Sequence, residues 1–460
     1  MNKNDTDQSI FPDVSSKAWK QRIQYELSGA DYNTEMLYQT TAGIKTKPFY
    51  NPEDQIELYA TDSRTKAPFK IGHELYCNHS QMTNKKAIWC FEKGCDQLKL
   101  LVQDNILDPD LLTKNISRNQ GLSFTLQKAH KDQLHKFIDF LNAHENPHWK
   151  IQLDPIEHYY SSGHWWKSQA EDFQLLKTSI EKTTQNTVLI DNRGLEAAGA
   201  NTTQQLAYAM AHAHEYILFL SAEGLLNKLS AFEFIFNVRA TDFLIETAKL
   251  RAFEILWNHL MALYGLDIAF EITSKPSKID QTLFQNNLNL IRNTSSLMAA
   301  IWGNSSTIYG LAFDHIHKKS NAYSDRLAMN QLLILKHECG LSHALDPIAG
   351  SYAIDKISAE IAENALSSFK QLEAQGGFLQ GLKDHSIQKD IDASFQKQLG
   401  KYVSQEKTLI GANTLFEKEE MVFEKYPFLR IEKRKTLIPP VITKRYASHF
   451  EQKAFEADEN

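Results

Sequence analysis

Residues 98–126 read LKLLVQDNILDPDLLTKNISRNQGLSFTL, with an apolar run at each end of a more polar stretch. Six more short runs of apolar, β-branched or aromatic residues follow: WKIQL (149–153), TVLID (187–191), YILFL (216–220), FEFIF (232–236), IAFEI (268–272) and STIYGL (306–311). Helical patterns separate most of them. Near-continuous apolar runs are typical of strands buried on both faces of a parallel sheet. About eight strand–helix units predict an α/β fold, and a TIM (β/α)8 barrel rather than an open sheet.

The flanks of this alternation predict a short helix over 19–27 and a turn-rich extended arm over 40–54, where Gly43, Pro48 and Pro52 stand. A long helix is expected over 242–264, apolar nearly all round and therefore buried. We expect an N-terminal tail, helix and arm (1–70), a barrel (71–395) and a C-terminal helical extension (396–460). Residues 1–12 are expected to form a disordered tail.

Residues 324–352, SDRLAMNQLLILKHECGLSHALDPIAGSY, predict a packed helix followed by a turn. Ala328, Leu332, Leu335 and Cys339 recur at helical spacing and mark one apolar face, so Cys339 is expected to be a core thiol. Glu338 is out of place on this otherwise apolar helix. The bland interpretation is an ordinary helix that ends at Gly340.

Composition narrows the class of protein. The 460 residues are 42% hydrophobic and 23% charged, with a formal net charge of -6, which argues against a nucleic-acid-binding protein. No apolar run is long enough for a membrane span, and the N-terminus lacks a secretory core. The four cysteines include no C-x-x-C pair, which favours free thiols and a cytoplasmic location.

Histidine pairs suggest metal sites only weakly. His212 and His214 stand with Glu215 before the YILFL run, and His315 and His317 stand near Asp314. For both pairs we favour a solvated helix end over a metal site, and no metal is expected. Three charged residues of the long helix are expected to form structural ion pairs, possibly at a subunit contact: Glu246, Lys249 and Arg251.

Several separated motifs, in the right order, resemble the substrate-domain barrel of the methylmalonyl-CoA mutase family. These are GIKTKPFYNPED (43–54), LEAAGANTTQQLAYAMAHAHEY (195–216), DFLIETAKLRAFEILW (242–257), residues 324–352 and EKTLIGAN (406–413). The resemblance runs from about Trp19 to Arg445. It implies a barrel that in active members holds the acyl-CoA along its axis, beneath a separate cobalamin domain at the carboxyl ends of the strands.

The departures from the family pattern matter as much as the matches. The sequence has no D-x-H motif for a cobalt ligand, and too few residues follow the barrel for a doubly wound domain, so no cobalamin domain is expected. Residues 68–81, PFKIGHELYCNHSQ, contain no arginine where active members carry a Tyr- and Arg-rich segment before the first strand. The substrate-facing His of active members aligns with Gly194, whose missing side chain cannot donate a hydrogen bond.

The resemblance therefore implies the small, non-catalytic subunit of a heterodimeric mutase. The large subunit would bind adenosylcobalamin and the acyl-CoA, and this chain would stabilise it. We expect no catalytic residue here, and Glu338 is a possible remnant of the cofactor site. Two alternatives stay open: an acyl-CoA-binding subunit whose cobalamin domain is a separate chain, and an unrelated barrel enzyme.

Overall fold

The computed structural model describes residues 14–40, 43–54, 68–103, 107–128, 130–343, 346–419, 421–425, 427–428 and 435–456. Eight parallel strands form one sheet in the order β6-β5-β4-β3-β10-β9-β8-β7. The two end strands, β6 and β7, also lie against each other, so the sheet curls into a nearly closed barrel. The strands are β3 (Lys70–Cys77), β4 (Gln97–Val102), β5 (Gly121–Leu126), β6 (Trp149–Gln152), β7 (Thr187–Asp191), β8 (Ala231–Val238), β9 (Ala269–Pro276) and β10 (Thr307–Tyr309). The predicted TIM barrel is confirmed.

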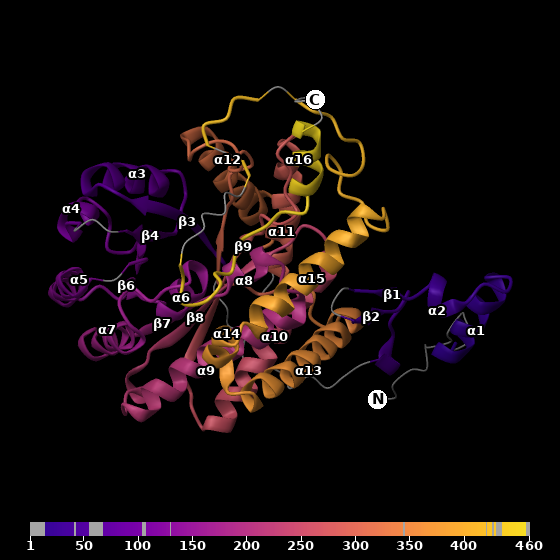
Figure 1. Ribbon diagram of the computed structural model, residues 1–460, viewed down its shortest axis with the longest axis horizontal. Coiled ribbons are helices and arrows are strands. Elements are labelled where there is room, and N and C mark those ends of the chain that lie inside the picture. Colours follow the sequence, from indigo (N-terminus) through magenta and orange to yellow (C-terminus); the bar gives the residue numbers. More distant parts are fainter. Residues whose placement is uncertain are drawn as a thin grey trace, which may run out of the picture.

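Helices surround the barrel, with α3, α5 and α7 on one side and α9, α10 and α13 on another (Figure 1). The helices between the strands are α3 (Ser80–Glu92), α4 (Pro109–Thr113), α5 (Lys131–His144), α6 (Pro155–Ser162), α7 (Gln169–Lys182), α8 (Arg193–Ala198), α9 (Thr202–Ala222), α10 (Phe243–Tyr264) and α11 (Leu288–Trp302). After β10 come α12 (Ala322–Leu333), a π-helical segment (Ile334–Glu338), α13 (Tyr352–Ala374), α14 (Gly377–Lys383), α15 (Ser386–Val403) and α16 (Ser448–Glu456).

Two strand predictions are corrected. YILFL at 216–220 lies in the last turns of α9, because a run of five apolar residues fits a buried helix as well as a strand. The first barrel strand, β3, was not predicted, and it falls within residues 68–81, which we had placed before the first strand. The two errors offset each other in the count of eight. The predicted domain boundary at 70/71 falls after the first residue of β3, and the one at 395/396 falls in the middle of α15.

The predicted long helix is confirmed as α10, and it packs on β8 through aromatic rings. Phe234 and Trp257 have ring centroids 4.6 Å apart, and Phe236 lies 4.9 Å from Phe253. Because side chains alternate along a strand, the phenylalanines at 232, 234 and 236 cover the outer face of β8. The alternate side chains of β8, at 233, 235 and 237, therefore point into the barrel.

The N-terminal region stands away from the barrel (Figure 1). It comprises α1 (Ser16–Glu26), which confirms the predicted helix, α2 (Tyr32–Glu35), a two-strand ladder (β1 Tyr38–Gln39, β2 Lys45–Thr46) and a 3-10 turn (Pro52–Asp54). The Tyr38 hydroxyl donates a hydrogen bond of 3.1 Å to Asp242, just before α10. The tail at 1–12 lies outside the described residues.

The apolar face predicted within residues 324–352 differs from its prediction at one position. Ala328, Leu332 and Leu335 are buried as expected, but Cys339 is exposed. The helix widens to a π-helix at Ile334–Glu338, so the last turn no longer continues the apolar face. Cys77, Cys90 and Cys95 are buried free thiols. Among the described residues, no helix is both long and apolar enough to cross a membrane.

Candidate functional site

Inside the barrel, one buried carboxylate gathers partners from three other strands. Glu233 of β8 lies 3.4 Å from Lys99 Nζ of β4 and 2.8 Å from Lys150 Nζ of β6. It also accepts hydrogen bonds from the Gln152 amide of β6 (2.6 Å) and the Thr273 hydroxyl of β9 (3.1 Å). The side chains of Lys99 and Glu233 are 0% and 1% exposed. Although burial opposes ionisation of Glu233, the charges of Lys150 and Lys99 hold its pKa well below the usual range.

The Lys99–Glu233 ion pair crosses the barrel axis. In the closed order of eight strands, β4 and β8 are four strands apart and so stand on opposite walls. A lysine from one wall and a glutamate from the other therefore meet in the lumen. This interior is filled by a charged pair and its hydrogen-bond partners rather than left as a channel.

A second ion pair crosses the axis nearer the carboxyl ends of the strands. Arg193, just after β7, binds Glu74 of β3 with an Nη1–Oε1 distance of 2.5 Å. It also binds Asp191 at the end of β7 at 2.5 Å, and Lys275 of β9 contacts Glu74 from the side. Strands β3 and β7 again stand on opposite walls. Two successive layers of the lumen are thus crossed by salt bridges.

Sequence reasoning did not find these charges. The signal was nonetheless present, because a lysine or glutamate stands at an alternate position within the apolar runs LKLLVQ, WKIQL and FEFIF. A charge at such a position in a doubly buried strand must find a partner across the barrel, since an unpaired buried charge is costly.

Gly194 lies in the first turn of α8, next to Arg193 at the barrel mouth. A Cβ built on Gly194 would lie 3.0 Å from Cε2 of the Tyr160 ring. The Tyr160 hydroxyl donates a hydrogen bond of 2.5 Å to the carbonyl of Asp191. The side of Gly194 where a side chain would stand is therefore covered by a tyrosine from α6.

Glu338 lies apart from Gly194 and from the ion pairs of the lumen. It is exposed, in the π-helical segment, where the neighbouring Lys336 binds Asp96 at 2.8 Å. Asp96 directly precedes β4, so this segment lies at the amino ends of the strands, opposite the mouth. The role of Glu338 as a cofactor-site remnant stays a prediction.

The histidines of α9 are not at a solvated helix end, which corrects that interpretation. His212 is fully buried, and its Nε2 lies 2.9 Å from Asp154 Oδ1. His214 lies between Glu373 (2.8 Å) and the Tyr264 hydroxyl (2.5 Å). Both histidines form structural contacts from within α9. The helix was expected to end near them because residues 216–220 had been predicted as a strand.

The second histidine pair also differs from its prediction. His317 is buried, and the backbone carbonyl of His317 accepts hydrogen bonds from the amides at 424 and 425. His315 lies in the loop after β10, where its Nδ1 is 3.0 Å from the carbonyl of Ala312. Among the described residues, no group of three His, Cys, Asp or Glu side chains is placed to hold a metal ion.

The charged residues of α10 form ion pairs as predicted. Lys249 binds Glu246 at 2.5 Å inside the protein, and Arg251 binds Asp346 at 3.0 Å. Glu246 also accepts the backbone N–H of Arg239 (3.1 Å), whose guanidinium binds Glu196 at 2.7 Å. These pairs tie α8, α10 and β8 together, so they support the barrel rather than line an open site.

The C-terminal segment lies over the mouth. The backbone N–H groups of Val441, Lys444 and Tyr446 donate to the carbonyls of Tyr160 (2.7 Å), Ala197 (2.7 Å) and Ile279 (2.9 Å). These carbonyls belong to the segments that follow β6, β7 and β9. The face where TIM barrels place their active sites is thus partly covered by this chain itself.

Glu157 of α6, at the mouth of the barrel, should make the stability of the protein depend on pH. Burial, followed by the nearby carboxylates of Asp191 and Asp154, raises the pKa of Glu157 from 4.5 to about 8. Between these values the folded chain keeps a proton that the unfolded chain has released, so this group lowers stability increasingly as pH rises. We expect Glu157→Gln to stabilise the protein by about 1 kcal/mol at about pH 8, after allowance for solvent screening, and to have little effect at about pH 4.5.

The measurement is the free energy of unfolding in urea at both pH values for both proteins. Equal pH dependence of the Gln variant and the parent would contradict the raised pKa.

Comparison with known proteins gives one consistent family. The model described as methylmalonyl-CoA mutase matches residues 145–438. The methylmalonyl-CoA mutase small subunit of Porphyromonas gingivalis is 26% identical over 436 residues, which are 88% of this chain and 70% of that protein. The methylmalonyl-CoA mutases of Rhizobium meliloti and Escherichia coli are 28% and 27% identical over 51% and 50% of this chain. These two alignments span about a third of each relative, 34% and 33%.

Proposed function

Because the chain belongs to the methylmalonyl-CoA mutase family, we propose that it is the small, non-catalytic subunit of a heterodimeric, adenosylcobalamin-dependent methylmalonyl-CoA mutase. In this proposal the large subunit binds the cofactor and the acyl-CoA and interconverts methylmalonyl-CoA and succinyl-CoA in the cytoplasm. The present chain supplies a second barrel that stabilises its partner.

The salt bridges across the lumen carry this proposal. A barrel that threads an acyl-CoA along its axis needs a lumen free of obstruction, whereas here Lys99 meets Glu233 and Arg193 meets Glu74 across it. Displacing either pair would leave buried charges without partners, which costs several kcal/mol. The same observation argues against an acyl-CoA-binding subunit whose cobalamin domain is a separate chain.

The mouth of this barrel does not fit adenosylcobalamin. Tyr160 covers Gly194, and the backbone of Val441, Lys444 and Tyr446 is hydrogen-bonded over the loops where a cofactor would approach the strands. This arrangement supports our placing the cofactor on the large subunit, and no step of the reaction is assigned to residues of this chain.

The N-terminal region supports a partner contact. No residue of α1 is buried, and its Trp19 and Tyr25 side chains are 48% and 78% exposed. The helix stands away from the barrel (Figure 1); Trp19 packs edge-on against Phe49 at 5.3 Å, and the remaining aromatic surface of the helix faces solvent. Exposed aromatic groups on a projecting element are typical of a protein–protein interface.

The test is co-expression with a mutase large subunit. We expect the two chains to co-purify in equal amounts, and the complex to turn over methylmalonyl-CoA when given adenosylcobalamin, while this chain alone is inactive. Calorimetry on this chain alone should detect no contribution from the acyl and pantetheine groups, so methylmalonyl-CoA should bind no more tightly than ADP, which lacks them. Turnover by this chain alone would contradict the non-catalytic role, and failure to co-purify would contradict the partnership.

A further inference from the structure

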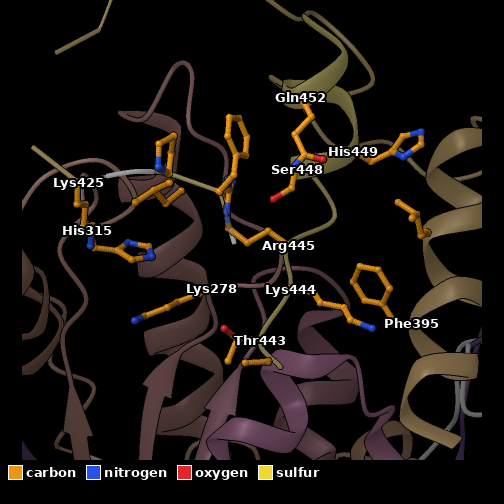
Figure 2. A pocket seen from close by; sticks show the side chains of 15 residues that line it. Lys278, His315, Phe395, Lys425, Thr443, Lys444, Arg445, Ser448, His449 and Gln452 are labelled. Atoms are coloured by element: carbon orange, nitrogen blue, oxygen red, sulfur yellow. The ribbon is translucent and has the colours of Figure 1, made fainter. Parts of the chain in front are cut away.

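A recess of about 550 Å³ lies at the carboxyl end of the barrel, between the loops after β9 and β10 and the C-terminal segment. Figure 2 shows Lys278, His315 and Lys425 on one side and Ser448, His449 and Gln452 of α16 on the other. Its lining includes four Lys or Arg side chains and two histidines. No Asp or Glu is among the described residues that line it.

A second recess of about 470 Å³ adjoins the first and shares Lys278, His315 and Lys425 with it. It adds more lysines, among them Lys318 and Lys319. Glu74 and Asp325 also line it, but these carboxylates are already paired, Glu74 with Arg193 and Lys275, and Asp325 with Lys86 at 3.0 Å. The shared wall between the recesses is therefore strongly electropositive.

Two of the cations in the first recess are free to bind a ligand. Lys444 is held by Asp392 at 2.5 Å, and Arg445 by Glu451 at 2.7 Å. In the described part of the chain, the side chains of Lys278 and Lys425 form no hydrogen bond or ion pair, and both residues keep only part of their surface exposed to solvent. Two unpaired ammonium groups in one recess are an unusual arrangement, because each raises the electrostatic energy of the other.

The electrostatics agree with this picture. Desolvation in the recess and the positive charge of Lys275 lower the pKa of Lys278. The pKa of His315 is lowered by burial and by the charges of Lys278 and Lys425. An anion bound between these groups would raise the pKa values of Lys278 and His315. Binding of the anion should therefore be accompanied by proton uptake.

The remaining wall is apolar. Ile316, Phe395, Leu399 and Phe428 line the recess beside the cations. Phe395 lies near Lys444 in Figure 2, on the side away from Lys278 and Lys425. A ligand that fits both parts carries a compact, multiply charged anion at one end and an apolar or planar group at the other.

We propose that this recess binds a small organic phosphate, with the phosphate group held by Lys278 and Lys425 and the organic group against the apolar wall. A lysine recognises phosphate as a point charge, and the Ser448 hydroxyl adds a hydrogen-bond donor to the lining of the same recess. This binding site does not depend on the proposed subunit role, since it is built from residues of this chain alone.

The test uses the full chain, with ADP as the probe and adenosine as the uncharged comparison, by isothermal titration calorimetry. We expect ADP to bind with saturable stoichiometry and adenosine to bind at least about tenfold more weakly. Lys278→Met and Lys425→Met should each weaken ADP binding about tenfold or more. Lys397→Met, which makes the same charge change at an exposed position of α15 outside the recess, should leave affinity unchanged.

Titration in two buffers of different ionisation enthalpy provides a second readout, with net proton uptake expected at neutral pH and lost in Lys278→Met. Equal binding of adenosine and ADP, or equal weakening by all three substitutions, would overturn the proposal. Each variant should unfold at the parent's urea midpoint and co-purify with the large subunit as the parent does, so failure of this proposal is distinguishable from failure of the subunit proposal.

Discussion

Replacing Glu233 with Gln is expected to lower the free energy of unfolding by about 3–5 kcal/mol, because it leaves Lys99 buried without its ion-pair partner. Lys99 is fully buried and burial lowers its pKa, and Glu233 does more than the other nearby carboxylates, Asp191 and Glu74, to favour the ammonium form. Gln152 and Thr273 donate to different oxygens of Glu233, so the single carbonyl oxygen of Gln can accept from only one of them. The loss therefore reports the charge together with one hydrogen bond. Urea is the denaturant of choice, since it does not screen charges as guanidinium does.

Glu271→Gln is the matched control for this substitution. Glu271 also binds Lys150, at 3.1 Å, but its side chain is 38% exposed at the start of β9. Its substitution is expected to cost no more than about 1 kcal/mol. The pKa of Glu233 is lowered in the folded state. The contribution of Glu233 to stability is therefore fully present above its pKa in the unfolded chain, about 4.5, and declines as pH falls below that value. Equal losses for the two variants at neutral pH would contradict a charged lumen.

Trp257→Ala is expected to destabilise the protein by about 3–5 kcal/mol, the range for emptying the site of a buried aromatic side chain. The Trp257 ring is 0% exposed and lies 4.9 Å from Phe232 and 6.4 Å from Phe270. Because Trp257 joins α10 to both β8 and β9, the cavity would open between the barrel and its outer layer. The indole N–H has no hydrogen-bond partner in the described residues, so the loss reports packing alone.

Leu263→Ala, on the same helix, is the comparison for this substitution. Leu263 is 73% exposed, so its truncation should change stability by no more than about 0.5 kcal/mol. Urea unfolding followed by far-ultraviolet circular dichroism measures both variants. A Trp257→Ala midpoint equal to that of Leu263→Ala would contradict the packing of α10 against the barrel.

Most of the fold could be predicted from periodicity, since seven of the apolar runs contain or overlap strands β4 to β10. Strand β3 was missed because His73, Glu74 and Tyr76 interrupt its apolar character, and their partners are distant in sequence. Glu74 binds Arg193 and Lys275, and His73 lies 3.9 Å from Asp325. A strand whose polar residues are satisfied by such distant contacts has no local pattern that reveals it.

The candidate sites depended still more on tertiary structure. Gly194 could be singled out by resemblance, but the tyrosine that covers it comes from another strand–helix unit. The basic recess joins loops after β9 and β10 to residues more than a hundred positions later, and no spacing in the sequence places Lys278 beside Lys425. Only the closure of the barrel and the course of the C-terminal segment bring them together.

The crossed lumen also bears on how such a chain can change over evolutionary time. Glu233 pairs with two lysines, and Glu74 pairs with both Arg193 and Lys275, so removing either glutamate alone takes the ion-pair partner from two buried cations. A lineage that began to refill this lumen with small neutral side chains would pass through a poorly folded intermediate whenever a glutamate was lost before its cations. A histidine placed at position 194 would therefore not open the barrel axis, because the salt bridges of Glu233 and Glu74 would still cross it.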